Sequence, residues 1–397
     1  MDTYIVLHAQ RGLRTRAPFD GAAVPFGTAE ANVAPVPQVE LADLTDDNVT
    51  DLARDPEIAA IARPMPLALI EPVSDPADGV RVAAASTWGV AAVKADTSPF
   101  DGAGVSVAVL DTGVDASHPA FQGVTFVEKD FTTEGNGDLQ GHGTHCAGTI
   151  FGRAVDGTRI GVAPGITRAL IGKVLDRNGS GSSDALFNAM NWAVENGAQV
   201  ISMSLGFDFP GMVGRLSQQM PVPLATSRAL EAYRGNLRMF DALMEMIVQG
   251  AAFKRDAVVV AATGNESTHN ATPPIAIAVS VPAAANHVVA VGAVGESPAG
   301  FVIANFSNIF PQVCAPGVGV ISAKAGGGLR ALSGTSMATP HVAGLAALWR
   351  QSLVAAGVPL SSRDVLSRIL ANATRTGFAP GATAALRGNG LAQAPQS

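Results

Sequence analysis

The feature that most constrains the fold is a series of short apolar runs that begins at Val105. These runs lack the polar alternation expected of a strand with one face in water. Uninterrupted apolar runs of this length are typical of strands that are buried on both faces. The runs are VSVAVLD (105–111), RALIGKVLD (168–176), AQVISMSLG (198–206), AVVVAATGN (257–265) and HVVAVGAVG (287–295).

Helix-like segments separate the apolar runs. Residues 184–197 and 229–253 carry apolar side chains at every third or fourth position, which is the spacing of an amphipathic helix. Alternation of buried strands with such helices predicts an α/β fold, in which helices flank a parallel sheet on both faces.

The N-terminal part of the chain has a different composition and predicts a separate small α+β module. Residues 17–38 are rich in proline, glycine and alanine, so we expect an irregular stretch there. The segment from Thr45 combines a capping residue, an acidic first turn and a later apolar strand. We therefore divide the chain into a module (1–80), a linker (81–86) and a main domain (87–397).

One connection in the main domain is longer than a regular strand-to-helix turn. Residues 207–226 contain several prolines and glycines and follow the apolar run that ends at Gly206. We expect an insertion-like loop there, and long loops inside a compact domain are usually functional or flexible.

Composition excludes several classes of protein. The chain is 47% hydrophobic, enough for a large core, while charged residues make up only 15% and the net charge is −7. These values favour neither a nucleic-acid partner nor an anionic membrane surface. No run reaches the roughly 18 apolar residues of a membrane span, and the first residues lack the order of a secretory signal. At face value the chain is cytoplasmic, and we expect a monomer.

The two cysteines, Cys146 and Cys314, are too few for a disulfide framework. Neither lies in a CxxC pair, so we expect both to be buried packing residues.

Three polar residues stand at the ends of predicted strands or the starts of predicted helices. Asp111 ends an apolar run, whereas His142 and Ser336 each begin a helix-like segment. Reacting groups gather at the carboxyl edge of an open parallel sheet. A serine hydroxyl needs a base within hydrogen-bond reach and a group that fixes the tautomer of that base. Asp111, His142 and Ser336 supply these three parts.

A fourth residue, Asn265, follows the run 257–262 and offers an uncharged amide donor. The helix that begins at Ser336 would direct free N–H groups and its positive dipole end at a carbonyl oxygen under attack. We therefore predict Asn265 as a second donor to the same oxyanion.

The motifs LDTGVDASHP, GHGTHCAG, ATGNE and GTSMATPHVAG occur in this order along the chain. With them the chain resembles the subtilisin-type serine endopeptidases (subtilases, peptidase family S8) from about Thr87 to its end. Four motifs in order are far more specific than one alone. The resemblance implies hydrolysis of peptide bonds through an acyl-enzyme, in which Ser336 attacks, His142 transfers the proton and Asp111 orients His142.

The resemblance also implies how a peptide would bind. An extended substrate would pair with two strand edges of the cleft, and pockets would favour a medium or large apolar side chain. The residues concerned are Gly179, Ser180, Gly181, Ser204, Leu205, Gly206, Ala262, Thr263 and Gly264.

The N-terminal module partly resembles the inhibitory propeptide of the same family. The proline-rich stretch stands where another helix would be expected. We expect the module to be an intramolecular inhibitor of a zymogen that is cut near residues 74–86. A permanent accessory domain is the alternative.

Many members of the family bind structural calcium. Here Val155 stands where a side-chain oxygen is often supplied, Arg153 and Arg159 flank it, and Gln312 replaces a common acidic residue. Calcium prefers several carboxylate or carbonyl oxygens, so we expect no required metal or other cofactor.

Two classes of function remain open. The first is a serine endopeptidase that cleaves extended polypeptides, with a broad or apolar preference for the residue before the cleaved bond. One form of this class is a processing protease dedicated to a single peptide partner. The second is a binding or regulatory protein built on a subtilase scaffold and held shut by its N-terminal module.

Overall fold

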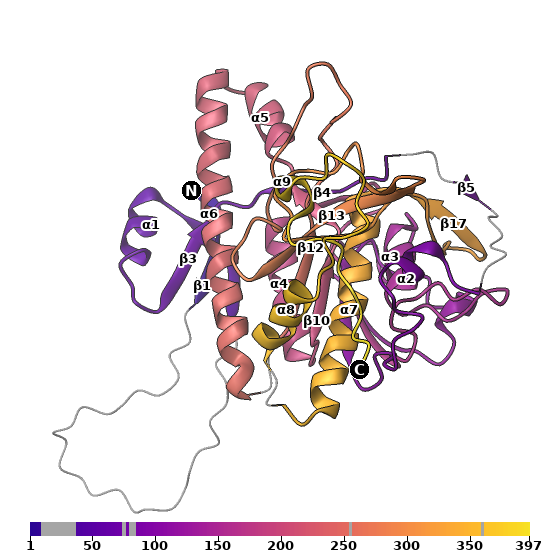
Figure 1. Cartoon of the computed structure of the whole chain (residues 1–397). Coiled ribbons are helices and arrows are strands. Elements are labelled where there is room, and N and C mark those ends of the chain that lie inside the picture. The colour runs from indigo at the N-terminus through magenta and orange to yellow at the C-terminus, as the bar shows by residue number, and fades with distance from the viewer. Residues whose placement is uncertain (9–36, 74–76, 79–84, 254–255, 359–360) are drawn as a thin grey trace, which may run out of the picture.

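The computed structural model describes residues 1–8, 37–73, 77–78, 85–253, 256–358 and 361–397 (Figure 1). The proline-rich stretch predicted at 17–38 falls outside these residues except for its last two. The same holds for the linker predicted at 81–86, of which only the last two residues are described.

The centre of the molecule is an eight-stranded sheet in the order β14-β13-β12-β10-β6-β8-β7, with β15 also paired to β13. All of its pairings are parallel except that of β13 with β14. Each of the five predicted apolar runs supplies a strand. The strands are β6 (Ser106–Asp111), β7 (Thr125–Asp130), β8 (Arg168–Lys173), β10 (Val200–Met203), β12 (Val258–Ala262), β13 (Val288–Ser297), β14 (Gly300–Ile303) and β15 (Val313–Pro316).

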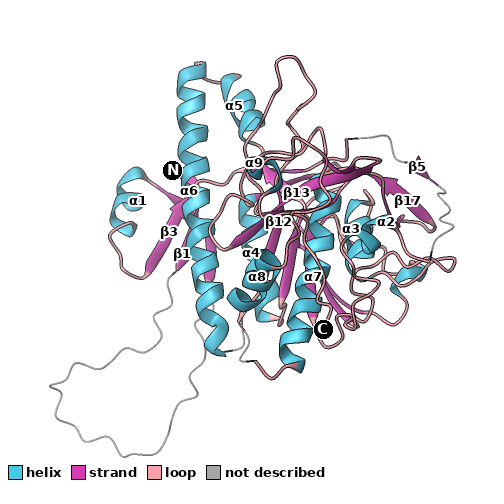
Figure 2. Cartoon of the chain, in the orientation of Figure 1, coloured by secondary structure: helices cyan, strands magenta, loops and turns pink. Residues whose placement is uncertain are grey.

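Helices cover both faces of this sheet (Figure 2). In β6, Val107 and Val109 belong to the core cluster that contains α3 (His142–Phe151) and α7 (Thr335–Ala355). The alternate residues Ala108 and Leu110 belong to the second cluster, with α4 (Ser183–Glu195) and α6 (Val222–Gln249). Successive side chains of a strand point to opposite faces, so burial on both faces requires an apolar residue at every position. The predicted α/β fold is confirmed.

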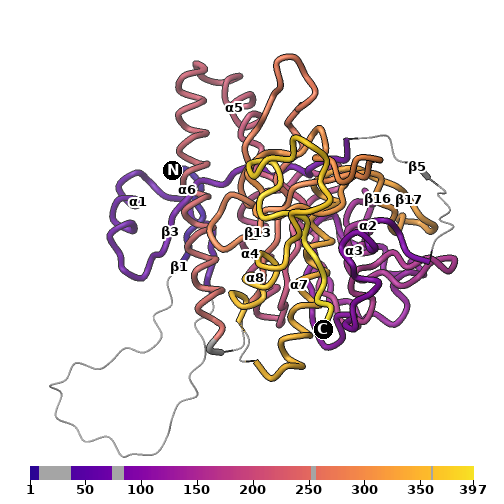
Figure 3. Tube along the Cα trace, in the orientation of Figure 1, coloured from indigo at the N-terminus to yellow at the C-terminus, as the bar shows by residue number. Residues whose placement is uncertain are grey.

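The N-terminal module forms a three-stranded antiparallel sheet in the order β2-β1-β3. Its elements are β1 (Asp2–His8), β2 (Gln38–Leu44), α1 (Asp46–Leu52) and β3 (Ile58–Ala62). As the sequence indicates, Thr45 caps α1, and its side chain accepts a hydrogen bond from Asn48 N. Ile5, Leu7 and Ala62 belong to the same core cluster as α4 and α6, so the module shares a core with the main domain. The module lies beside α6 (Figure 3).

The last part of the predicted module (1–80) crosses the main domain. The strand β4 (Pro66–Leu69) lies between β9 (Ser180–Ser182) and β11 (Leu205–Phe207) and is antiparallel to both. Further on, β5 (Ala77–Asp78) pairs with β17 (Leu329–Leu332), which in turn pairs with β16 (Val320–Ala323). Both β4 and β5, which lie within the predicted module (1–80), therefore pair with strands of the main domain.

The loop predicted at 207–226 is largely helical in the structure. It contains α5 (Phe209–Ser217) and the first turns of α6, which begins at Val222 rather than near residue 229. Asp208 caps α5 by accepting a hydrogen bond from Gly211 N at 2.8 Å. The prolines that suggest a loop lie in the first turns of α5 and α6, where no intrahelical N–H bond is lost.

The remaining short helices are α2 (Trp88–Ala92), α8 (Ser362–Ala371) and α9 (Ala384–Arg387). None of the described helices is long and apolar enough to cross a membrane.

Candidate active site

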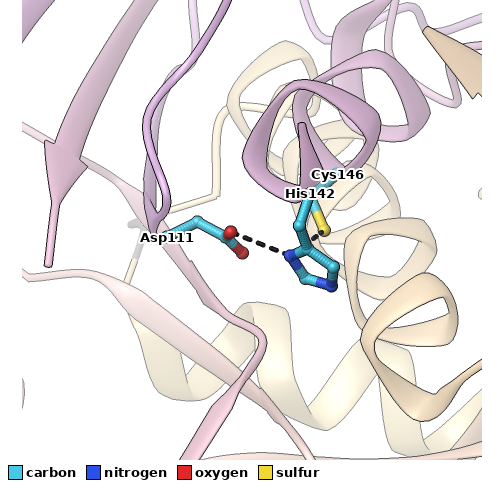
Figure 4. A group of neighbouring side chains, drawn as sticks. All are labelled: Asp111, His142 and Cys146. Carbon is cyan, nitrogen blue, oxygen red and sulfur yellow. Dashed lines mark hydrogen bonds and ion pairs between the residues drawn. The ribbon is translucent and has the colours of Figure 1, made fainter. Parts of the chain in front are cut away.

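Asp111 and His142 form a buried pair at the carboxyl edge of the sheet (Figure 4). Asp111 is the last residue of β6, and His142 is the first residue of α3. The Nδ1 atom of His142 lies 2.8 Å from Oδ1 of Asp111, and both side chains are 1% exposed. A buried carboxylate at this distance fixes the tautomer with the proton on Nδ1 and leaves Nε2 as the basic nitrogen.

The charge of Asp111 changes how readily His142 takes up a proton. Burial alone would lower the pKa of His142, but the adjacent carboxylate outweighs it and holds that pKa well above its ordinary value. Among the described residues, Nε2 of His142 has no hydrogen-bond partner although it is buried. The basic nitrogen is therefore free to accept a proton.

One further carboxylate, that of Asp138, positions this pair, and the sequence analysis missed it. Its Oδ1 accepts hydrogen bonds from Thr112 Oγ1 at 2.9 Å and Gly141 N at 2.7 Å. Its Oδ2 accepts hydrogen bonds from the amide and hydroxyl groups of Thr144, at 2.9 and 2.6 Å. Through these hydrogen bonds Asp138 connects Thr112, the residue after Asp111, to the first turn of α3. An acidic residue just before a helix was the only sequence signal.

Ser336 lies in the first turn of α7 and is fully buried. Its hydroxyl donates a hydrogen bond of 2.9 Å to the carbonyl oxygen of Ile70, the residue after β4. The Sγ atom of Cys146 lies 3.7 Å from His142 Nδ1 and 3.4 Å from the carbonyl oxygen of Ser336. Cys146 therefore contacts both predicted catalytic residues and places the starts of α3 and α7 beside each other.

Asn265 lies next to Ser336 and is held in a fixed orientation. Its Oδ1 accepts hydrogen bonds from the amide and hydroxyl of Thr335, at 2.9 and 2.8 Å. Its Nδ2 donates to the carbonyl oxygen of Glu71 at 2.8 Å. A Cβ atom at Gly334 would lie 2.9 Å from Ser336 Oγ and 3.0 Å from Asn265 Nδ2. Glycine is therefore required there, because both polar groups border the same point.

The predicted substrate-binding stretches contact the chain's own strand β4. Leu69 N donates to Gly179 O at 2.7 Å, and Ile70 N lies 3.4 Å from its acceptor, Ser204 O. The remaining pairs are Ala68 with Ser180, Leu67 with Gly181, Leu69 with Leu205 and Ala68 with Gly206. The third stretch does not pair with β4. Ala262 and Thr263 are buried, and Gly264 N donates a hydrogen bond to Thr335 Oγ1. It supports the start of α7.

Two further buried histidines have structural hydrogen bonds. His145 Nε2 lies 3.0 Å from the carbonyl oxygen of Val320, and His341 Nδ1 lies 2.9 Å from that of Met337. Burial lowers the pKa of His145 to about 3 and that of His341 to about 4. Both rings are therefore neutral at neutral pH.

One group of described side chains could hold a metal by the type of its donor atoms. The ligand atoms of Asp111, His142 and Cys146 lie within 4.8 Å of one another. In this group, Nδ1 of His142 is already hydrogen-bonded to the carboxylate of Asp111. The arrangement fits an acid–base pair with an adjacent thiol.

We expect neither cysteine of the folded protein to react with a thiol reagent at neutral pH. Cys146 is 1% exposed and Cys314 is fully buried. Burial raises the pKa of both thiols, that of Cys314 to about 12, so little thiolate forms. Titration with dithionitrobenzoate should detect no thiol in buffer and two in denaturant. One rapidly reacting thiol in buffer would contradict this expectation.

The predicted catalytic residues lie in the part of the chain that matches a known protein family. The model of the subtilase family (peptidase S8) matches residues 102–390. The chain is 35% identical over 301 residues to subtilisin DY of Bacillus licheniformis, covering 73% of this chain and 92% of the relative. It is 32% identical over 361 residues to the thermostable alkaline protease of Halalkalibacterium halodurans, covering 89% and 81%. For subtilisin E of Bacillus subtilis the identity is 35% over 269 residues, covering 66% and 60%.

Proposed function

The chain belongs to the subtilase family and is a subtilisin-like serine endopeptidase, and from this premise we propose that Asp111, His142 and Ser336 are its catalytic triad. Asn265 is the side-chain donor of its oxyanion hole. The observation that carries this proposal is that Ser336 and Asn265 donate hydrogen bonds to the carbonyls of two consecutive residues, Ile70 and Glu71, of an extended segment.

In the proposed mechanism, Ser336 Oγ attacks the carbonyl carbon of the scissile peptide while Nε2 of His142 takes the hydroxyl proton. Asp111 stabilises the resulting imidazolium through Nδ1. The amide of Asn265 stabilises the oxyanion. The C–N bond then breaks, and His142 returns the proton to the leaving amine, which leaves an ester on Ser336. Water attacks this ester with His142 again as base, and His142 then returns the proton to Ser336 Oγ as the ester C–O bond breaks, which releases the new carboxyl terminus.

We further propose that the N-terminal module inhibits the enzyme to which it is joined. Its strand β4 is hydrogen-bonded on both edges, to β9 and β11, as an extended substrate would be. Ser336 faces the carbonyl of Ile70, whereas Asn265 binds that of Glu71. Because the nucleophile and the oxyanion donor engage different carbonyls, the segment blocks the cleft in a geometry unsuited to attack. The proposed cut at 74–86 lies beyond this blocked position.

The same contacts support a preference for apolar peptides. Ile70, which stands beside Ser336, is 6% exposed, and Leu67 and Leu69 of the same strand are buried as well. We propose that substrates place apolar side chains at the corresponding positions and that backbone pairing tolerates other differences.

We propose that catalysis needs no metal. At the loop where relatives often bind calcium, Arg159 donates hydrogen bonds to the carbonyls of Gly161 and Val162, at 3.0 and 2.7 Å. Arg153 donates to the carbonyl of Phe151 at 3.0 Å. These guanidinium groups bring positive charge to the loop and already bind three of its carbonyl oxygens, which disfavours a calcium ion there.

Labelling with a fluorophosphonate probe tests the proposed function. We expect slow labelling of the full chain, faster labelling once the module has left the cleft, and none in Ser336→Ala. N-terminal sequencing of the labelled protein should give a terminus within 74–86. Rapid labelling of protein that keeps Met1 would contradict the inhibitory role. Absence of labelling after the module has been removed would favour the regulatory scaffold.

A further inference from the structure

We propose that Glu134 is a positioning residue of the active site. Its carboxylate holds β9, the edge strand with which a peptide pairs, at a fixed place relative to the end of β6 that carries Asp111. This inference rests on the proposed function, because it takes the place of β4 in the cleft as that of a substrate.

The strand β9 needs such a support because it lies at the edge of its small sheet. Within the described part of the chain its one strand partner is β4, which runs between β9 and β11. Leu69 N of β4 donates a hydrogen bond of 2.7 Å to Gly179 O, just before β9. This pairing is lost whenever the cleft is vacant, so the place of β9 must be set by another contact.

The turn that leads into β9 is held together by its own hydrogen bonds. Asp176 Oδ1 accepts hydrogen bonds from Asn178 N at 2.8 Å and from Ser180 N at 2.9 Å. Asp176 N in turn donates to Ser180 O at 2.9 Å. Arg177 lies within this turn, so a group that holds the backbone of Arg177 also holds Gly179 and the start of β9.

Glu134 binds this turn through its backbone as well as its side chain. Glu134 Oε2 accepts a hydrogen bond from Arg177 N at 3.0 Å, and Oε1 accepts one from Arg177 Nε at 2.8 Å. The guanidinium contact alone would contribute little, because the Arg177 side chain is 60% exposed. The backbone contact matters more, since it fixes the main chain two residues before Gly179, whose carbonyl binds the peptide in the cleft.

On its other side, Glu134 contacts the buried Lys173. The Lys173 ammonium lies 3.2 Å from Glu134 Oε2 and donates a hydrogen bond of 2.8 Å to the carbonyl oxygen of Thr112, the residue after Asp111. In the sheet, Lys173 is directly opposite Asp111 on the neighbouring strand β8. The Lys173 side chain is 2% exposed and that of Glu134 is 16% exposed, so solvent ions screen this pair little. Glu134 therefore joins β9 to the backbone beside Asp111.

The turn after β7 fixes the place of Glu134 itself. Asp130 Oδ2 accepts hydrogen bonds from the amides of Thr133 and Gly135, at 3.0 and 2.7 Å. Both of these residues have positive φ, 87° and 85°. Because this conformation is unfavourable for a β-branched residue such as threonine, the hydrogen bonds to Asp130 are what hold the turn.

Amide hydrogen exchange in the full chain tests the proposal without requiring activity. In protein that carries Ser336→Ala, we expect Glu134→Ala to speed exchange of the Leu69 amide at least about tenfold, because β9 is no longer held beside β4. Glu245→Ala is the matched control. The Glu245 carboxylate also lies within 4.0 Å of two basic side chains, but it belongs to α6. Its loss should leave the exchange within about twofold.

Arg177→Ala makes this test independent of whether Glu134→Ala folds. The substitution removes an exposed side chain and keeps the backbone contact, so exchange of the Leu69 amide should rise by about threefold. Unchanged exchange in Arg177→Ala, or in a folded Glu134→Ala protein, would overturn the proposal.

Two substrates separate positioning from a general loss of structure. For an extended peptide that spans β9, Glu134→Ala should lower kcat/KM at least about tenfold, mainly through a higher KM, because a misplaced edge weakens pairing. Turnover of p-nitrophenyl acetate, which cannot pair with a strand, should fall by no more than about twofold. Equal losses with both substrates would contradict a positioning role. If the unsubstituted chain turns over neither substrate but exchange responds as expected, the proposed activity fails while the role of Glu134 stands.

Discussion

Ser336→Ala is expected to lower kcat for peptide hydrolysis by about 10⁶-fold, the size known for triad serines in this enzyme family. The physical reason is that the variant lacks the hydroxyl proposed to form the acyl-enzyme, so only binding and oxyanion stabilisation remain. The fold should not change, because the Ser336 hydroxyl bonds to Ile70 O rather than to the main sheet. Turnover of a chromogenic peptide, with an unfolding curve for each variant, measures both effects.

Ser352→Ala is the matched control for this experiment. Ser352 lies on the same helix, α7, near its other end, and we expect its replacement to leave kcat within about twofold, as for most substitutions away from a site. If Ser336→Ala kept more than about one hundredth of the activity, Ser336 would not be the nucleophile.

Asp111→Asn is expected to lower kcat by about 10⁴-fold and to shift the pH profile. An asparagine at this place can no longer hold the proton of His142 on Nδ1 or stabilise the imidazolium. Without the carboxylate, burial becomes the dominant influence on the ring, so the pKa of His142 should fall.

The sign of the pH dependence follows from the protonation state that catalysis requires. His142 acts as a base only when neutral, and its raised pKa means that activity falls as the pH drops through a midpoint above 6.5. In Asp111→Asn the midpoint of kcat/KM should move to lower pH. Asp115→Asn, which removes a neighbouring carboxylate outside the triad, should leave the midpoint in place. An unshifted midpoint in Asp111→Asn would show that Asp111 does not set the ionisation of His142.

The sequence predicted the central sheet well because its signal is strong and local. A strand buried on both faces needs apolar residues along its length, and β6 is apolar from Val107 to Leu110. The starts of α3 and α7 were also predictable, since small residues and glycines surround His142 and Ser336.

Other features were not predictable, because they depend on contacts between distant segments. The helix α5 was predicted as a loop because Pro210 and Gly211 are turn residues elsewhere, whereas here they stand in a first turn capped by Asp208. The position of Asp138 becomes meaningful only when Thr112 and Thr144 are side by side. Likewise, nothing in the local sequence shows that Ile70 and Glu71 reach Ser336 and Asn265.

In the proposed binding mode, where a substrate takes the central place of β4 in its small sheet, this place limits which proteins can be cut. A chain in this place must offer the hydrogen-bonding groups of both backbone edges, to β9 and to β11. Residues inside a folded helix or sheet already use those groups and would have to give them up first. Native proteins should therefore be attacked only at protruding loops or frayed ends, and resistance should follow how easily a target opens locally rather than how often a favoured residue occurs in it.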